Sequence, residues 1–224
     1  MKQILLLTIV VFLALQIKAQ LVYDKWGNMI PFSSAEEYKT DIEAHEVPGY
    51  VIPYMNNDSL CRKYNDGKTI KELEDRFVGG INLQIKPISL KENGVRIKLQ
   101  NGTLWRYAIE GASAKGICVD LGNPRLPKGT YLALIAVDTT VSLNQPPRVY
   151  YQENLLESHK TRGLTGCVYG NKLIIEYYEP GSLKNKEDIE IKWITYEFVG
   201  FGNPGKSSYN ESGLKSGYWA WATI

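Results

Sequence analysis

The middle of the chain alternates between apolar and polar side chains with a period of two. Residues 81–85 and 95–99 show this alternation most clearly. Such a period places apolar side chains on one face of a strand and polar side chains on the other, so both segments predict strands with one face in water. Asn93-Gly94 and Asn101-Gly102 are typical turn sequences, and they separate these strands from their neighbours.

Further β-like segments follow at short intervals. Residues 131–137 are apolar on both faces, which predicts a central strand covered on both sides. In residues 189–198 the apolar positions change phase after Trp193, which predicts a β-bulge or a strand that crosses between sheets. Many short strands separated by turns containing Gly and Pro predict an all-β fold, an antiparallel β-sandwich of the jelly-roll type. The remaining predicted strands are residues 103–109, 115–121, 149–151 and 172–178.

The N-terminal region has helical spacing instead, and it predicts one or two short helices that pack on the sandwich. Ser34 is expected to cap a helix that runs to His45, because Glu37 occupies the capping-box position three residues later. A second helix is expected over residues 69–77, where apolar side chains recur at helical spacing.

Four segments follow from these patterns. Residues 1–19 begin with Met1-Lys2, continue with a short apolar run and end on Ala19, which is typical of a secretory signal peptide. The apolar run is too short to span a bilayer comfortably, so we expect the chain to be secreted, periplasmic or on the cell surface. The other segments are an irregular and helical region (20–75), the β-sandwich domain (76–200) and a linker-like tail (201–224).

The apolar end of this tail leaves two alternatives open. Residues 217–224 are rich in aromatic side chains, which is unusual after a linker of Gly, Pro, Ser and Asn. They are expected either to dock as a last strand or to begin a segment that is missing.

Charge excludes one class of partner. The whole chain has 26 Lys and Arg against 24 Asp and Glu, and residues 1–19 contain Lys2 and Lys18 but no acidic residue. Removal of the signal peptide therefore leaves 24 of each sign. A formally neutral chain without a basic block argues against nucleic acid as a partner.

Three cysteines, Cys61, Cys118 and Cys167, allow at most one intrachain disulfide. Export permits such a bond, and Cys118 with Cys167 is the preferred pair because both lie in β-like segments. Three buried free thiols are the alternative. His45 and His159 lie in unrelated contexts, and no Cys and His cluster has the spacing of metal ligands. The sequence thus predicts no metal site, no cofactor and no catalytic residue.

The block from Asn101 to Leu134 reads NGTLWRYAIEGASAKGICVDLGNPRLPKGTYLAL. It resembles the pro-region-like β-sandwich module that precedes the protease domain in secreted trypsin-like serine proteases of the lysyl endopeptidase type. Weaker similarities extend the resemblance over roughly residues 50–201. The residues that match the family's motifs are expected to pack in strands and turns. They include Trp105, Arg106, Gly111, Pro127, Gly129 and Glu176.

The resemblance implies a protein that binds rather than catalyses. A trypsin-like enzyme needs a Ser nucleophile, a His base and an Asp orienter, and no segment here matches the family's catalytic motifs. The resemblance implies a secreted folding partner or inhibitor of a separately encoded protease, or a truncated relic of such a protease. The alternative function is a module that binds carbohydrate or a cell surface through aromatic side chains, since the chain holds five Trp and 15 Tyr.

Overall fold

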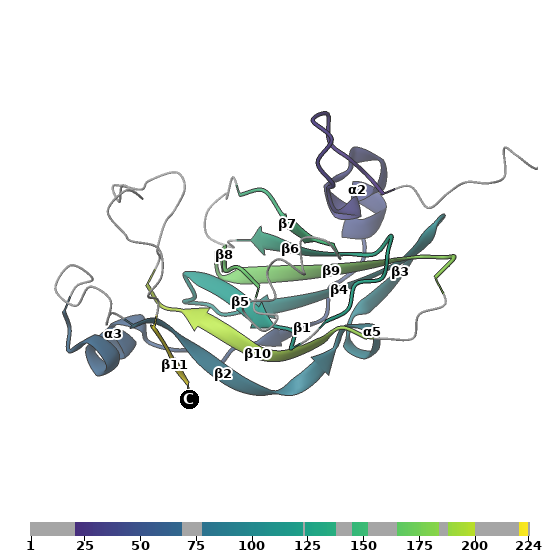
Figure 1. Ribbon diagram of the computed structural model, residues 1–224. Coiled ribbons are helices and arrows are strands. Elements are labelled where there is room, and N and C mark those ends of the chain that lie inside the picture. Colours follow the sequence, from purple (N-terminus) through teal and green to yellow (C-terminus); the bar gives the residue numbers. More distant parts are fainter. Residues whose placement is uncertain are drawn as a thin grey trace, which may run out of the picture.

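The computed structural model describes residues 21–68, 78–122, 124–137, 145–151, 165–183, 188–199 and 220–223. Two β-sheets lie face to face in it (Figure 1). This arrangement confirms the all-β sandwich that the alternation of apolar and polar residues predicts. The predicted signal peptide (1–19) and the predicted helix over 69–77 lie outside the described residues.

One sheet has six strands and the other has five. The six-stranded sheet contains β1 (Gly49–Val51), β3 (Val95–Leu99), β4 (Gly102–Glu110), β6 (Tyr131–Val137), β7 (Arg148–Tyr150) and β9 (Lys172–Pro180). Their order is β1-β4-β9-β6-β7, and β3 also pairs with β4. The five-stranded sheet contains β2 (Val78–Ser89), β5 (Gly116–Asp120), β8 (Val168–Tyr169), β10 (Glu190–Glu197) and β11 (Ala220–Thr223). Their order is β11-β2-β10-β5-β8. Only β1 and β11 run parallel to their neighbours in the described part of the chain.

The main core lies between the two sheets, and both halves of β10 face it across a register shift against β2. The register of β10 against β2 shifts between Ile191 and Trp193, which confirms a bulge where the apolar positions change phase. Ile191 pairs with Ile88 but Trp193 pairs with Gln84, so the additional residues lie on β2, and both halves of β10 face the same side. The core side chains on either side of the shift are Ile189, Ile191, Ile194, Tyr196 and Phe198.

A second apolar cluster lies on the opposite face of the six-stranded sheet, where the N-terminal region covers it (Figure 1). The 3-10 helix η1 (Phe32–Ser34) and helix α2 (Glu36–Glu43) supply Phe32 and Ile42. Strand β6 contributes Tyr131 and Ala133 to this cluster, whereas the alternating residues Leu132 and Leu134 face the main core. The prediction that residues 131–137 form a central strand covered on both faces is therefore confirmed.

The predicted start of the first helix is wrong. Helix α2 begins at Glu36 with Ala35 at the N-cap position, and no side chain caps it. Ser34 belongs to η1 instead, because the burial of Phe32 and Ser33 against the sheet draws this turn into a tighter geometry. The helix also ends at Glu43, before His45.

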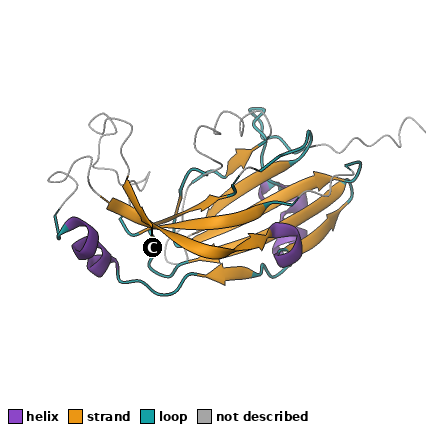
Figure 2. Cartoon of the chain, turned by 60° about the horizontal axis from the view of Figure 1, so that its bottom comes forward, coloured by secondary structure: helices purple, strands orange, loops and turns teal. Residues whose placement is uncertain are grey.

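Two further helices lie at opposite ends of the sandwich (Figure 2). Helix α3 (Asn57–Asn65) has no counterpart among the sequence predictions, although the Asn56 side chain caps it by accepting a hydrogen bond from the Ser59 backbone N–H at 2.9 Å. Helix α5 (Leu90–Asn93) forms a single turn between β2 and β3. No helix in the described ranges is both long and apolar enough to cross a membrane.

The end of the chain takes one of the two alternatives that the sequence leaves open. Residues 220–223 form β11, which docks beside β2 at the edge of the five-stranded sheet. The linker-like residues 201–219 lie outside the described residues.

Candidate functional site

A small hairpin at the start of the described chain forms one wall of a pocket. Tyr23 and Met29 pair across it as an antiparallel bridge. The Asp24 carboxylate holds the loop between them by accepting hydrogen bonds from the backbone N–H groups of Trp26 and Asn28, both at 2.8 Å. The Asn28 side chain also donates to Asp24, and these hydrogen bonds lower the pKa of the Asp24 carboxyl below its ordinary value.

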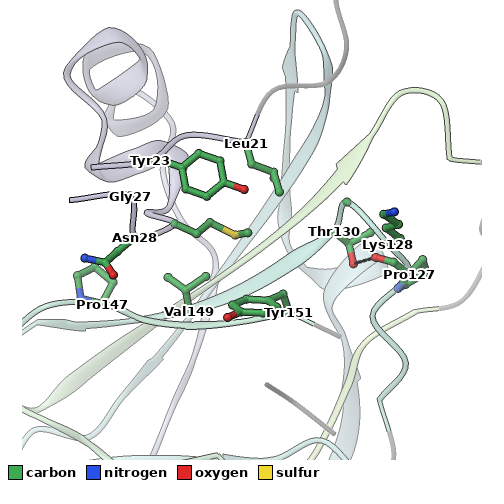
Figure 3. Close-up of a pocket in the computed structure, with 12 residues that line it drawn as sticks. Leu21, Tyr23, Gly27, Asn28, Pro127, Lys128, Thr130, Pro147, Val149 and Tyr151 are labelled. Atoms are coloured by element: carbon green, nitrogen blue, oxygen red, sulfur yellow. Dashed lines mark hydrogen bonds between the residues drawn. The ribbon is translucent and has the colours of Figure 1, made fainter. Parts of the chain in front are cut away.

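The pocket has a volume of about 640 Å³ and is open on one side. Three segments meet around it: the hairpin, the loop that leads into β6, and strand β7 with Tyr151. Figure 3 shows Leu21 and Tyr23 on the hairpin side and Val149 and Tyr151 on the β7 side. The lining residues are Leu21, Tyr23, Gly27, Asn28, Met29, Pro127, Lys128, Gly129, Thr130, Pro147, Val149 and Tyr151.

The loop into β6 owes its shape to two residues that the sequence singles out. The Thr130 backbone N–H donates to the Pro127 carbonyl at 3.0 Å, and the Thr130 hydroxyl donates to the same oxygen at 2.7 Å. Gly129 takes a φ of +87°, which side chains with a Cβ rarely adopt. Pro127 and Gly129 therefore form the predicted turn, and they also line the pocket.

The hairpin exposes two aromatic side chains to solvent beside the pocket. Tyr23 is 53% exposed and Trp26 is 71% exposed. The Lys25 ammonium lies 3.9 Å from the centre of the Trp26 ring, a cation–π contact on the surface. Exposed large side chains next to a pocket are typical of a binding surface rather than of a core.

A buried polar cluster lies under the N-terminal region, on the same face of the six-stranded sheet. Arg106 and Glu176 are register partners on β4 and β9, and the Arg106 Nε lies 3.5 Å from a Glu176 carboxylate oxygen. The Tyr131 hydroxyl donates to Glu176 at 2.5 Å and accepts from the Phe32 backbone N–H at 2.9 Å. Burial, and then the nearby Glu176 carboxylate, raise the pKa of Tyr131 well above its ordinary value.

The other two motif residues have packing and turn positions. Trp105 lies in the main core, where its ring stacks on Tyr177 with 5.8 Å between centroids. Gly111 accepts a hydrogen bond from the Ala114 backbone N–H at 2.8 Å in a turn that follows β4.

A third feature lies in the five-stranded sheet, where it joins β5 to the residue directly before β8. Cys118 and Cys167 form a disulfide, the pair that the sequence favours. Glu197 lies beside it, and its carboxylate oxygen comes within 4.8 Å of both sulfur atoms. Burial raises the pKa of the Glu197 carboxyl to about 7. Cys61 is a free thiol in α3, and burial raises its pKa as well.

Sequence reasoning missed both the pocket and the position of Glu197. The hairpin has a local signal, because Asp24 and Gly27-Asn28 form a turn between Tyr23 and Met29. The pocket itself has no local signal, since its three segments are far apart in the chain.

The chain matches no family of known proteins, no curated protein and no solved structure.

Proposed function

We propose that this chain is an exported, non-catalytic β-sandwich module that binds carbohydrate in the pocket between the N-terminal hairpin and β7. The lining of the pocket supports this proposal, because it combines aromatic rings with hydrogen-bonding groups in one half-open space. Its volume of about 640 Å³ suits a ligand of one or two sugar units.

The chemistry of a sugar fits the two kinds of lining group. One face of a sugar ring presents C–H groups, which pack on aromatic rings such as those of Tyr23 and Tyr151. The hydroxyls around the ring need donors and acceptors, which the Asn28 amide and the tyrosine hydroxyls provide. The Lys128 ammonium adds a donor at the rim. The position of both tyrosines on opposite walls favours a ligand that lies between them (Figure 3).

A matched pair of variants tests the proposal. Tyr23→Ala removes an aromatic wall of the pocket, whereas Tyr54→Ala removes a tyrosine that is 74% exposed and does not line it. Affinity electrophoresis of the full chain in gels containing xylan, soluble β-glucan, glycol chitin or alginate measures retention. We expect Tyr23→Ala to weaken binding about tenfold or more, since aromatic anchors dominate such contacts. Tyr54→Ala should bind like the parent protein.

Two results contradict this function. One is that none of the four polysaccharides retards the parent protein. The other is that Tyr54→Ala weakens retention as much as Tyr23→Ala, which means that any exposed tyrosine serves equally well.

A protein partner is the second candidate, and strand β1 favours it. This strand lies at the end of its sheet, so no strand of the described residues pairs with its other edge, and it carries Val51, which is 71% exposed. Tyr54 follows just after the strand. An extended segment of a protein can add to such an edge through backbone hydrogen bonds and place side chains against the exposed apolar groups. A secreted trypsin-like protease, the partner implied by the resemblance of residues 101–134, is the proposed protein.

The same two variants distinguish carbohydrate binding from protease binding. For a protease partner, Tyr54→Ala becomes the test variant and Tyr23→Ala becomes the control. The parent protein is incubated with trypsin-like proteases, including a lysine-specific one, and the slowing of peptide hydrolysis is measured. Protease binding at β1 predicts that Tyr54→Ala and Val51→Lys weaken inhibition while Tyr23→Ala does not. Absence of any slowing by the parent protein contradicts the protease partner.

A further inference from the structure

Three side chains of metal-ligating type converge on the outer face of the five-stranded sheet. Cys118 lies on β5, Cys167 lies directly before β8, and Glu197 lies on β10. The Ile117 and Val119 side chains enter the main core, so Cys118 between them points to the other face of the strand. One ligand atom from each residue lies within 4.8 Å of the others.

The sheet register produces this convergence. Strand β5 pairs with β8 so that Ile117 lies opposite Val168, which brings Cys118 and Cys167 side by side. On its other edge β5 pairs with β10, where Glu197 lies opposite Gly116. Glu197 is thus two residues away from the Cys118 position on the neighbouring strand, on the same face.

Among the described residues, Glu197 is the member of this group with a carboxylate oxygen that lacks a hydrogen-bond partner. The side chain is 4% exposed, and within the described part of the chain its Oε2 atom has no hydrogen-bond partner. Space for this oxygen depends on Gly116, because a Cβ on that residue would clash with it. A buried carboxylate oxygen with no donor is costly, and a bound cation is one group that offsets the cost.

We propose that reduction of the Cys118–Cys167 disulfide creates a zinc site, in which both thiolates and the Glu197 carboxylate bind the ion. In the oxidised protein each sulfur is bonded to the other, and neither is a thiolate. An external dithiol supplies two electrons and two protons, becomes a disulfide itself and leaves two cysteine thiols. Zn²⁺ then replaces the two thiol protons, which pass to solvent.

The ligand set and its dimensions favour zinc over harder cations. Thiolates select zinc over magnesium and calcium, which prefer oxygen ligands. Bond lengths of about 2.3 Å to sulfur and about 2.1 Å to oxygen place the ligand atoms of a tetrahedral site roughly 3.5 Å apart. The three ligand atoms lie within 4.8 Å of one another, so the two sulfurs need only move apart after reduction to reach that spacing. Cys167 is only half-buried, so the ion and the dithiol reach the site from its side, where water takes the fourth position.

Zinc stoichiometry of the full chain tests the proposal. The protein is reduced with dithiothreitol, freed of it by gel filtration under nitrogen, and dialysed against ZnCl₂, after which bound zinc is measured by atomic absorption. We expect one zinc ion per reduced chain and none per oxidised chain. Glu197→Gln should weaken binding about tenfold or more, and Cys118→Ser should abolish it. Cys61→Ser is the matched control, because this thiol lies in α3, outside the cluster, and should leave binding unchanged.

Thermal unfolding separates a native site from thiols that bind zinc only after unfolding. Zinc should raise the Tm of the reduced parent protein, because a ligand of the folded state stabilises it, and should raise the Tm of Glu197→Gln much less. A lowered Tm shows that zinc prefers the unfolded chain and overturns the proposal. Equal zinc binding by the oxidised protein, or by Glu197→Gln, also overturns it.

Discussion

Glu176 is a carboxylate with no solvent exposure, and its burial depends on groups from three other parts of the chain. Tyr131 from β6 donates a hydrogen bond to it, and Arg106 from β4 places a positive charge beside it. The Arg106 Nη1 in turn donates to the Ile42 carbonyl of α2 at 3.3 Å. A buried charge needs both a counter-charge and hydrogen bonds, so this cluster fixes the N-terminal region over the sheet.

Removal of the tyrosine hydroxyl from this cluster should be costly. Tyr131→Phe leaves Glu176 without its short hydrogen bond and the buried Phe32 N–H without an acceptor. We expect the free energy of unfolding to fall by about 2–4 kcal/mol, measured by urea denaturation. Tyr178→Phe is the control, since its hydroxyl donates one bond to the Asn101 carbonyl at 3.1 Å, and it should cost about 1 kcal/mol. Equal losses in the two variants contradict the special role of Tyr131.

Gly116 offers a second test at the scale of one residue. A methyl group there meets the Glu197 carboxylate and also approaches the Val168 carbonyl at 3.1 Å. Gly116→Ala should lower the free energy of unfolding by about 1–3 kcal/mol, because the added methyl group overpacks the space beside Glu197. In a Glu197→Ala background most of this loss should disappear, and a double-mutant cycle by urea denaturation measures the coupling. An unchanged loss in that background shows that Glu197 does not occupy the space beside Gly116.

At the scale of elements, the N-terminal region is held to the sandwich by few anchors. Helix α2 has a single buried residue, Ile42, and η1 inserts Phe32 between Tyr38, Tyr131 and Tyr178. The hairpin that precedes them has most of its side chains in solvent, but Leu21, Val22 and Met29 pack against the same apolar cluster as Phe32 and Ile42. Its position over β7 therefore depends on this cluster as a whole. The shape of the pocket therefore depends on how η1 and α2 pack on the sheet.

Truncation of the helix anchor should weaken both the fold and the pocket. Ile42→Ala should lower the free energy of unfolding by about 2–5 kcal/mol, because a fully buried side chain leaves a cavity. Hydrogen exchange measured by mass spectrometry should show faster exchange over residues 21–45 than in the parent protein. Val51→Ala, at an exposed apolar site, should change stability by less than about 0.5 kcal/mol. Unchanged exchange over 21–45 in Ile42→Ala contradicts the anchoring role.

At the scale of the whole molecule, the disulfide closes a long loop that contains β6 and β7. Cys118 and Cys167 are separated by 49 residues, so the bond joins β5 to the segment before β8 after the chain has passed through the other sheet. The bond therefore restrains a part of the unfolded chain that contributes to both sheets of the folded protein. Cys61 in α3 takes no part in this restraint.

Loss of the disulfide should show the size of this restraint. For a closed loop of this length the loop-entropy relation gives a stabilisation of about 4 kcal/mol, which Cys118→Ala with Cys167→Ala should remove in large part. Guanidinium denaturation measures the loss, and Cys61→Ala should change stability far less. A double variant as stable as the parent protein shows that the bond contributes nothing to the free energy of unfolding.

The positions of the strands follow from the sequence because they depend on local alternation. Residues 95–99 and 131–137 are strands at those bounds, and the phase change near Trp193 locates the register shift between β10 and β2. Helix ends follow less well. Ser34 is a good N-cap by type, but the burial of Phe32 placed it in a different turn. Local preference decides an element only where tertiary packing agrees with it.

Local patterns along the chain are enough to predict the sandwich, its doubly covered strand, and the neutral charge of the segment after residue 19. It also favoured the Cys118–Cys167 pair, whose partners lie in neighbouring β segments. Only the tertiary structure decided what surrounds them. The pocket and the Cys118, Cys167 and Glu197 cluster depend on which strands pair and in which register, and register is set by long-range packing of the whole core. A local pattern shows which face a side chain lies on, but it does not show which distant residue shares that face.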